Sequence, residues 1–239
     1  MPLPIFRMFM SERPHASALF SAGHHFFFSG NGVSETRNLS YGPHKRHKLD
    51  IYEPPEITDQ TEIIVFIHGG GWETGSKELH RFIGRSWSRN NFIVILPNYR
   101  LVPDDTYPEQ LHDITLCLSW IKNSYEVFND SFYLAGHSAG AHLASMTGFS
   151  EKWLEAANLS KDDIAGFILL AGVYQFYPYE RADKRVKSFV VKRRYWEEAQ
   201  PINHLHQNIS PVFIYHGGKD NEVLPEQSYQ LRKRPSELG

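Results

Sequence analysis

Cysteine is nearly absent from this sequence, since Cys117 is the single one in 239 residues. One cysteine excludes an intramolecular disulfide framework, and it excludes a zinc site of the usual four-ligand kind built on cysteines. The chain therefore does not need an oxidising compartment. Cys117 falls beside the apolar positions of an expected helix, so we expect a buried thiol rather than a reactive one.

An excess of charge of one sign is also missing. Lysine and arginine number 25 and aspartate and glutamate 27, which gives a formal net charge of -2 at pH 7. This balance provides no global field to attract the phosphate backbone of a nucleic acid or an anionic lipid surface. We therefore expect no nucleic-acid partner.

Long apolar runs are absent too. The longest, at 63–67 and 167–173, have the length of a strand and fall well short of the roughly 18 residues that a membrane span requires. The N-terminus is apolar in places, but Arg7, Glu12 and Arg13 interrupt it before the apolar region of a secretory signal can form. We expect no membrane span and a cytoplasmic protein.

From about residue 46 onward, short β-branched and aromatic runs alternate with longer helical patterns. This alternation is typical of βαβ units around a mostly parallel sheet, and it predicts the α/β fold class. Most of the runs are continuously apolar, as in strands covered on both faces, whereas 48–53 alternates like an edge strand. Strands are expected at 48–53, 63–67, 92–96, 132–135, 167–170 and 212–215. Helices are expected at 79–89, 108–123 and 141–148, and another from about 225.

Two stretches depart from this alternation. Residues 1–40 are rich in Gly, Ser, Asn and His without sustained periodicity, and we expect an N-terminal arm that lies over a domain formed by residues 41–239. Residues 174–200 are rich in aromatic and charged side chains and lie between two expected strands, which predicts an insertion at the rim of the sheet. No internal repeat and no long Gly/Ser-rich or Pro-rich linker divides the chain.

The sharpest motif is GHSAG at 136–140, which lies between an apolar run and a helix-like segment. A strand, a tight turn and a helix are the context of a nucleophile elbow, in which Ser138 projects its hydroxyl above the sheet. The turn is crowded, so the residues two positions on either side of the serine must lack bulk. The alternative is a serine in a purely structural turn.

A second motif, HGGGW at 68–72, follows the apolar run at 63–67 directly. Three glycines at the end of a strand allow backbone N–H groups to turn toward a ligand, as an oxyanion hole requires. The expected donors are the N–H groups of Gly70, Gly71 and Ala139. The alternative is a plain glycine turn, which the order and placement of the two motifs disfavour.

Together these motifs resemble the α/β-hydrolase superfamily, in particular its carboxylesterase and hormone-sensitive-lipase-like branch and the related kynurenine formamidases (arylformamidases). The segments 41–43, 49–52 and 98–103 look similar to the connecting segments of the same families, so the resemblance covers roughly residues 40–230. It implies a doubly wound, mostly parallel sheet with helices on both faces. It also implies a serine hydrolase without a cofactor or a metal, acting on a small-molecule ester or amide.

The resemblance leaves the substrate open. Esterases and formamidases share acyl-transfer chemistry, in which the serine attacks a carbonyl and water releases the acyl group. The segment 75–77 is similar to the formamidase version, whereas the third glycine, Gly71, favours an esterase that cleaves a small carboxylic ester. Hydrolysis of an aryl formamide is therefore the alternative reaction. A non-catalytic binding module of the same fold is the alternative from a different functional class.

In this fold the acid of the triad follows a late strand, and Asp220 follows the run at 212–215. It would hold a histidine in the productive tautomer. The alternative is an aspartate that caps a turn before the next helix, and Glu222 is a weaker competitor for the acidic role.

The base of the triad is missing from its expected place. In this fold the histidine comes after the acid, and no histidine follows Asp220. We therefore expect the chain to lack the last strand and the histidine loop, so that its hydrolase domain is incomplete at the C-terminus. Such a chain would be truncated or decayed, with weak activity or none.

Other histidines do not offer an obvious replacement. His142 would lie one turn behind Ser138 on the same helix, so we expect a packing role. His204 and His206 precede the acid-bearing strand and His216 ends it. The pairs His24-His25 and His44/His47 have no accompanying carboxylate cluster, so we expect solvated surface and no metal.

The rim insertion offers groups that could select the substrate. Its aromatic side chains could stack on an aryl group, and its basic run could bind a carboxylate. The alternative is a solvated charged face with the aromatic rings packed on the sheet. The aromatic residues are Tyr174, Phe176, Tyr177 and Tyr179, and the basic ones are Lys192, Arg193 and Arg194. Nothing in the sequence indicates an oligomeric state.

Overall fold

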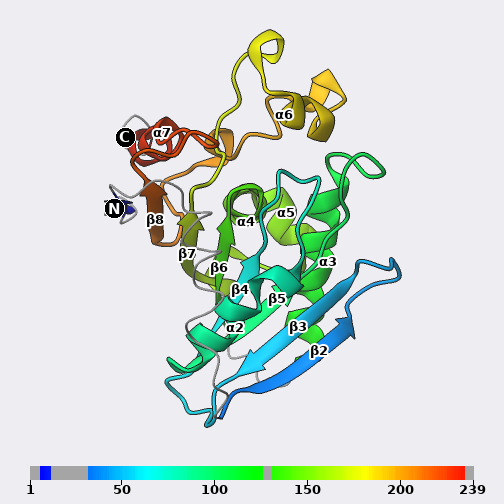
Figure 1. Cartoon of the computed structure of the whole chain (residues 1–239), viewed down its shortest axis with the longest axis vertical. Helices are drawn as coiled ribbons and strands as arrows, with labels where there is room; N and C mark the ends of the chain where they lie inside the picture. Colours follow the sequence, from blue (N-terminus) through cyan, green and yellow to red (C-terminus); the bar gives the residue numbers. More distant parts are fainter. Residues whose placement is uncertain (1–5, 12–31, 126–130, 235–239) are drawn as a thin grey trace.

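An eight-stranded sheet forms the centre of the molecule (Figure 1), in a computed structural model that describes residues 6–11, 32–125 and 131–234. The strand order is β1-β8-β7-β6-β4-β5-β3-β2. Strand β3 runs antiparallel to its neighbours β2 and β5, and all other neighbouring strands are parallel. The strands are β1 (Phe6–Ser11), β2 (Ser34–Ser40), β3 (Lys48–Glu53), β4 (Glu62–Ile67), β5 (Phe92–Pro97), β6 (Phe132–His137), β7 (Ile164–Leu170) and β8 (Val212–Gly217).

Helices and short 3-10 turns connect the strands. The α-helices are α2 (Arg81–Ser88), α3 (Glu109–Ser124), α4 (Ala139–Phe149), α5 (Glu151–Ala156), α6 (Lys184–Phe189) and α7 (Glu226–Lys233). The 3-10 turns cover Lys77–His80, Lys161–Asp163, Tyr179–Arg181, Arg193–Tyr195 and Pro201–His204. The sequence predicted helices in the regions of α2, α3, α4 and α7, and the structure confirms them.

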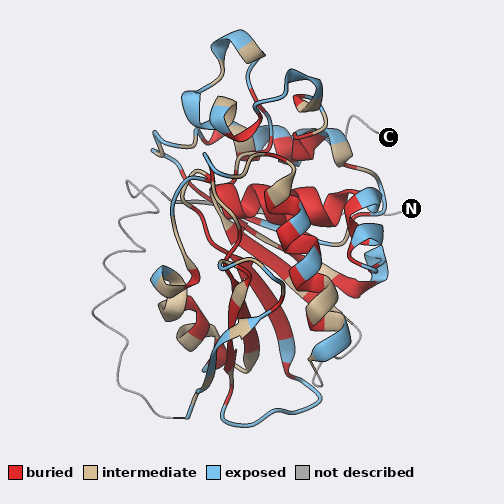
Figure 2. Ribbon diagram, turned by 90° about the vertical axis from the view of Figure 1, so that its right-hand side faces the viewer, coloured by how far each residue is buried: buried red, intermediate tan, exposed pale blue. Residues whose placement is uncertain are grey.

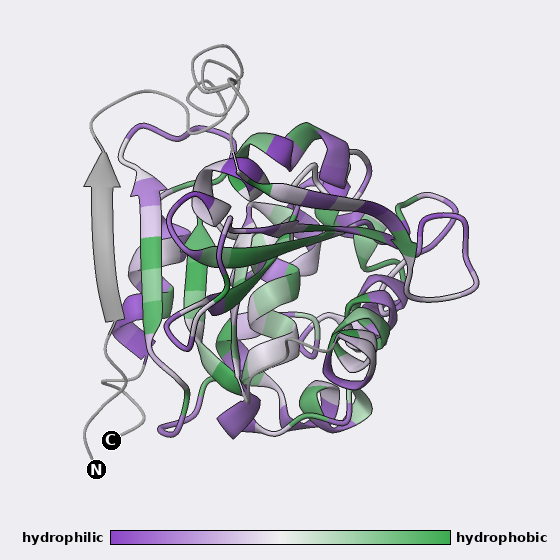
Figure 3. Ribbon diagram, turned by 90° about the horizontal axis from the view of Figure 1, so that it is seen from below, coloured by the Kyte–Doolittle hydropathy of each residue, from purple (hydrophilic) through white to green (hydrophobic). Residues whose placement is uncertain are grey.

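Alternate residues of the central strands pack into two separate hydrophobic clusters. In β4, Ile63 and Val65 belong to a large cluster with residues of α3 and α4. Their neighbours Ile64 and Phe66 belong to a second cluster, together with Ile83 of α2. A strand alternates its side chains between the two faces of a sheet, so both faces are covered by helices. The central strands and α4 are accordingly buried (Figure 2), and they form a hydrophobic centre within more polar loops (Figure 3).

The N-terminal part of the chain differs from the prediction. Residues 1–40 were expected to be an arm over the domain, but Ser34–Ser40 pairs with β3 as strand β2. Strand β3 is therefore not an edge strand, and its residues 49–52 are buried. The sequence did not predict strand β2, because its residues are mostly polar and its side chains are exposed or half-buried. Backbone hydrogen bonds, which leave no such pattern, join it to the sheet.

The opposite edge of the sheet holds a second N-terminal strand. Strand β1 runs parallel to β8, in a register from Phe6 opposite Val212 to Ser11 opposite Gly217. The sequence predicted that a last strand would be missing, and in the described part of the chain α7 is the only helix or strand that follows β8. The place beside β8 is nevertheless filled, by a strand from the other end of the chain. The prediction of an arm lying over the domain is wrong for β1 as well as for β2.

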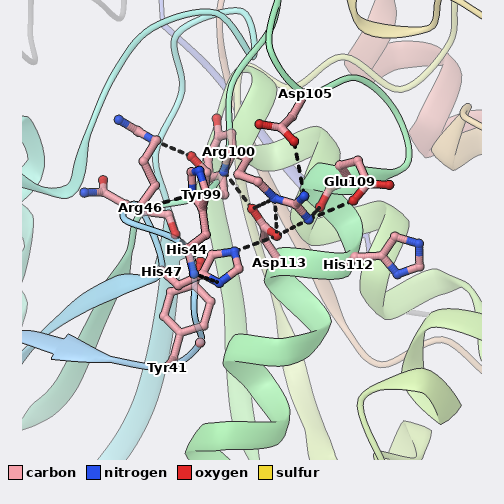
Figure 4. Close-up of polar contacts among 12 residues, drawn as sticks. Tyr41, His44, Arg46, His47, Tyr99, Arg100, Asp105, Glu109, His112 and Asp113 are labelled. Atoms are coloured by element: carbon pink, nitrogen blue, oxygen red, sulfur yellow. Dashed lines mark hydrogen bonds and ion pairs between the residues drawn. The ribbon is translucent and has the colours of Figure 1, made fainter.

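An ion-pair network centred on the buried Asp113 joins α3 to the segments around His47 and Arg100 (Figure 4). Asp113 of α3 is 1% exposed, and its carboxylate accepts hydrogen bonds from Arg100 at 2.6 to 3.0 Å. His47 donates from Nε2 to the same carboxylate at 2.9 Å, because its Nδ1 accepts from the backbone N–H of His44. His47 is therefore buried, which corrects the expectation that His44 and His47 lie on a solvated surface. The sequence pattern could not reveal Asp113, 66 residues away.

Candidate active site

Three loops that carry the predicted site residues leave the sheet at the same edge. Strands β4, β6 and β8 are parallel to one another within the sheet, and the segments after them begin at His68, Ser138 and Gly218. The carboxyl ends of parallel strands meet at one edge, which is where α/β folds bind ligands. Residues 174–200, expected as a rim insertion, contain α6 and lie beyond this edge (Figure 1).

Ser138 occupies a strained turn between β6 and α4. Its φ is 54° and its ψ is -119°, a conformation that non-glycine residues adopt only when the surrounding structure imposes it. Its backbone N–H donates to the carbonyl oxygen of Leu170 in β7 at 2.9 Å. The structure therefore places Ser138 in the strand-turn-helix context that the motif predicted.

The flanking glycines allow two backbones to approach closely. A Cβ on Gly140 would lie 2.0 Å from the carbonyl oxygen of Ile67, at the end of β4. A Cβ on Gly136 would lie 2.4 Å from the carbonyl group of Gly140. The first turn of α4 thus packs directly on the strand that leads into the HGGGW segment, and the predicted need for small residues two positions from the serine is confirmed.

The HGGGW segment turns through left-handed backbone conformations. The φ angles are 122° at Gly70, 62° at Gly71 and 61° at Trp72. Such angles suit glycine, and they turn the loop back so that Thr74 donates its N–H to the carbonyl oxygen of Gly70 at 2.9 Å.

Tyr99 holds the start of this loop. Its ring stacks on His68 with 4.3 Å between ring centroids, and its hydroxyl donates to the carbonyl oxygen of His68 at 3.0 Å. Burial lowers the pKa of His68 to about 3. The first residue of the segment is therefore a neutral packing group.

A cavity of about 570 Å³ joins these elements. Ser138, Ala139, Gly70, Gly71 and Asp220 all line it, so the structure brings together every site residue that the sequence predicted. Much of its remaining wall is apolar, from Trp72, Val173, Phe176, Val186, Val223 and Leu224. The cavity can hold a small organic molecule with its reacting group beside Ser138.

Asp220 lies in the turn after β8. Its Oδ1 accepts hydrogen bonds from the backbone N–H groups of Glu222 at 2.9 Å and Val223 at 3.0 Å. The turn-capping role, which the sequence left as the alternative, is thus present, while the residue also faces the cavity. Glu222 is exposed and pairs with Arg185 at 3.1 Å, as the weaker competitor for the acidic role.

The histidines considered as replacement bases are mostly engaged elsewhere. His142 donates from Nε2 to the carbonyl oxygen of Ala199 at 2.8 Å, in the packing role expected for it. His204 bonds the carbonyl oxygen of Glu198 at 2.6 Å, and His206 accepts from the backbone N–H of Asn208 at 3.3 Å.

His216 lies buried beside the turn that contains Asp220. Its Nε2 donates to the carbonyl oxygen of Val223 at 2.8 Å, and its Nδ1 accepts from the hydroxyl of Ser228 at 2.6 Å. Its Nε2 is 3.9 Å from Oδ2 of Asp220. Burial lowers the pKa of His216, so the ring is neutral and both of its nitrogens are engaged with groups other than Ser138.

One imidazole at the site was missed by sequence reasoning. His137 lines the cavity beside Ser138, and burial lowers its pKa to about 4. A Cβ on Gly69 would lie 3.0 Å from Nδ1 of His137 and 3.2 Å from Cβ of Ser138. The motif itself contains this histidine, but its spacing does not indicate that His137 lines the cavity.

The rim segment contributes different residues from those expected. Phe176 and Tyr177 line the cavity, whereas Tyr174 is fully buried and Tyr179 packs against Trp196 at 4.9 Å between ring centroids. Residues 192–194 are exposed and are not among the lining residues. The cation that does line the cavity is Arg185, which sequence reasoning did not single out.

Within the ranges 6–11, 32–125 and 131–234, no group of three or more His, Cys, Asp or Glu side chains is arranged to hold a metal ion. The pair His24-His25 lies outside these ranges. In the same described part of the chain, no helix is long and apolar enough to cross a membrane.

Comparison with known proteins places these features in a family. The BD-FAE family matches residues 49–234. Isoprenylcysteine alpha-carbonyl methylesterase from Arabidopsis thaliana is 29% identical over 225 residues, which cover 85% of this chain and 52% of that protein. Esterase LipQ from Mycobacterium tuberculosis is 26% identical over 82% of this chain and 51% of its own length. Kynurenine formamidase from Danio rerio is 28% identical over 70% of this chain and 54% of its own length. The chain thus spans about half the length of these curated relatives.

Solved structures agree on the fold. Esterase B from Lactobacillus rhamnosis superposes with a TM-score of 0.77 at 22% identity, covering 93% of this chain and 76% of that one. Esterase 2 from Thermogutta terrifontis gives a TM-score of 0.69 at 20% identity, covering 87% of this chain and 80% of that one. The predicted α/β-hydrolase fold is therefore confirmed, and the family match and the named relatives support the predicted branch.

Proposed function

The chain belongs to the BD-FAE family, and from this membership we propose that it is a serine hydrolase of the esterase type that cleaves a small carboxylic ester. The observation that carries the proposal is the position of Ser138, which lies in a strained turn and faces one cavity together with Asp220 and the glycines of the HGGGW segment. The named esterases among its relatives support the same reaction class. We also propose the cytoplasmic location that the sequence favours.

In the proposed reaction, Oγ of Ser138 attacks the ester carbonyl carbon while its proton passes to a base. Backbone N–H groups of Gly70, Gly71 and Ala139 would stabilise the negative charge that develops on the carbonyl oxygen. The alcohol leaves with a proton, and an acyl group remains bonded to Ser138. Water then attacks the acyl group and restores the serine hydroxyl.

The base limits this reaction in the present chain. His142, His204 and His216 are hydrogen-bonded away from Ser138, and His137 is a weak base because burial lowers its pKa to about 4. In the subtilisin series, loss of the triad histidine costs about 10⁶ in turnover. We therefore propose that this chain turns over slowly, with Asp220 in the place of the acid and with His137 as the histidine that lines the cavity.

A second reaction has specific support. Kynurenine formamidases are among the relatives, and Phe176 and Tyr177 give the cavity aromatic walls. Hydrolysis of an aryl formamide uses the same acyl-transfer steps. Parallel assays with p-nitrophenyl esters and N-formylkynurenine distinguish the two, since an esterase favours the first substrates and a formamidase the second.

Labelling with a fluorophosphonate probe tests the nucleophile and the base separately. We expect slow labelling at Ser138, identified by peptide mass, that accelerates when free imidazole is added, because the cavity has room for a base from solution. Ser138→Ala should remove the labelling, whereas Ser145→Ala, in the helix α4 that follows Ser138, should retain it. Absence of label at Ser138 even with imidazole contradicts the assigned nucleophile. Rapid stoichiometric labelling without imidazole contradicts the weak-base proposal.

A further inference from the structure

Arg185 of α6 connects the rim segment to Glu222, in the turn after β8, and both residues line the cavity. Its Nη2 lies 3.1 Å from Oε2 of Glu222. Asp183 contacts Arg185 at two places. Its Oδ1 accepts a hydrogen bond from the backbone N–H of Arg185 at 2.7 Å and lies 3.4 Å from Nε of the same residue. The hydrogen bond with Glu222 raises the pKa of Arg185 further, so the side chain is a permanent cation. Asp183 contacts its backbone end and Glu222 its guanidinium end.

The methylene stem of Arg185 lies on the HGGGW segment. A Cβ on Gly71 would be 3.1 Å from Cδ of Arg185 and 3.9 Å from Cγ. The stem therefore covers the face of Gly71 at van der Waals distance, with no room between them for another group. Gly71 is one of the proposed donors to the carbonyl oxygen of the substrate, so the stem lies beside the reacting carbonyl.

These contacts fix the course of the side chain from α6, over Gly71, to Glu222. Arg185, Gly71, Glu222 and Ser138 all line the same cavity. A substrate group extending past Gly71 must therefore meet the stem of Arg185. Removing the stem while leaving the backbone in place would lengthen the cavity on this side.

We propose that Arg185 is a specificity-determining residue, whose stem closes the cavity beside Gly71 and restricts the substrate to esters with a short chain on that side. The inference rests on the proposed function, because it takes the ester carbonyl to lie between Ser138 and Gly71. The two partners are exposed, at 47% for the side chain of Arg185 and 64% for that of Glu222. Exposed ion pairs contribute little free energy, so the stem discriminates by about tenfold rather than absolutely.

Binding measurements in a Ser138→Ala background test this without chemistry. Two ligand series are used, ethyl esters of acids from acetate to octanoate and acetate esters of alcohols from ethanol to octanol. Trp72 lines the cavity, so quenching of tryptophan fluorescence reports binding. The measured quantity is a ratio of two dissociation constants in each series. The Kd for ethyl acetate, the shortest ester of both series, is divided by the Kd for the longest ester, which is ethyl octanoate in one series and octyl acetate in the other.

We expect Arg185→Ala to raise this ratio about tenfold in one of the two series, and that series identifies the side on which the stem lies. Arg185→Met keeps an unbranched stem without the charge, and should stay within threefold of the parent. Glu222→Gln weakens the ion pair but keeps the stem, and should do the same. Circular dichroism and Tm of each variant confirm folding.

Three outcomes overturn the inference: no change of the ratio in Arg185→Ala, an equal rise in Arg185→Met, or an equal rise in Glu222→Gln. The first shows that the stem does not limit length, and the other two assign the effect to charge. Failure of the proposed function looks different, because then no ester of either series binds to the parent protein at all.

Discussion

His142 donates its Nε2 proton to the carbonyl oxygen of Ala199 at 2.8 Å, and this bond joins α4, the helix that follows Ser138, to the end of the rim segment. The ring also packs edge-on against Trp72, with 5.1 Å between ring centroids. Trp72 in turn stacks on Phe189 of α6 at 4.3 Å. The site, its helix and the rim segment therefore share one aromatic cluster around a neutral imidazole.

Burial lowers the pKa of His142 to about 4, whereas an unfolded histidine has a pKa of about 6.5. Between these values the unfolded chain binds the extra proton, so this residue stabilises the fold above pH 6.5 and the contribution is lost as the pH falls toward 4. The slope is roughly 1 kcal/mol per pH unit.

His142→Gln should flatten the dependence of the unfolding free energy on pH by this amount, measured by urea denaturation from pH 7 to 4.5. Ser145→Ala, a buried change on the same helix without a titrating group, should leave the slope unchanged, and an equal slope in His142→Gln contradicts the assignment.

Arg100 has two aspartate partners that differ in burial. The side chain of Asp113 is 1% exposed and that of Asp105 is 24% exposed. Asp113→Asn removes the buried carboxylate that pairs with both Arg100 and His47. We expect a loss of about 3 kcal/mol in the unfolding free energy. Asp105→Asn should cost less than about 1 kcal/mol, because the exposed pair is screened by solvent. Equal losses in chemical denaturation would show that burial does not set the strength of this network.

The close contact at Gly140 predicts a strong effect of a single methyl group. Gly140→Ala places a Cβ 2.0 Å from the carbonyl oxygen of Ile67, and neither backbone can move without disturbing the turn at Ser138. We expect a loss of about 3 kcal/mol or failure to fold.

Gly71→Ala is the matched control for this prediction, because the atom it meets, Cδ of Arg185 at 3.1 Å, belongs to an exposed side chain that needs to shift by only a few tenths of an ångström. It should cost about 1 to 2 kcal/mol, from the left-handed backbone alone. Thermal denaturation of both variants checks the order, and a milder effect at Gly140 contradicts it.

Cys117 is fully buried within α3, and burial raises the pKa of its thiol. Since it is the single cysteine, a thiol reagent such as DTNB should release no thiolate equivalent from the folded protein and one equivalent in denaturant. Prompt reaction of the native chain at neutral pH would place the thiol at the surface. Cys117→Ser should give no signal under either condition.

The sequence by itself determined the fold class, most of the strands and the segments that carry the site. It could do so because these features are local: the spacing of apolar residues reflects the period of a strand or helix, and the glycines of GHSAG and HGGGW reflect turns within a few residues. Asp220 was proposed from the family resemblance, which places the acid of the triad after a late strand, together with the strand predicted at 212–215.

Only the tertiary structure decided what depends on distant residues. Strand β2 and strand β1 join the sheet through backbone hydrogen bonds, which leave little trace in side-chain pattern. His47 is buried because Asp113 meets it, and Arg185 reaches the site because the chain returns α6 to Gly71. Such pairings are set by how the whole chain packs, and the periodicity of a short segment carries no information about them.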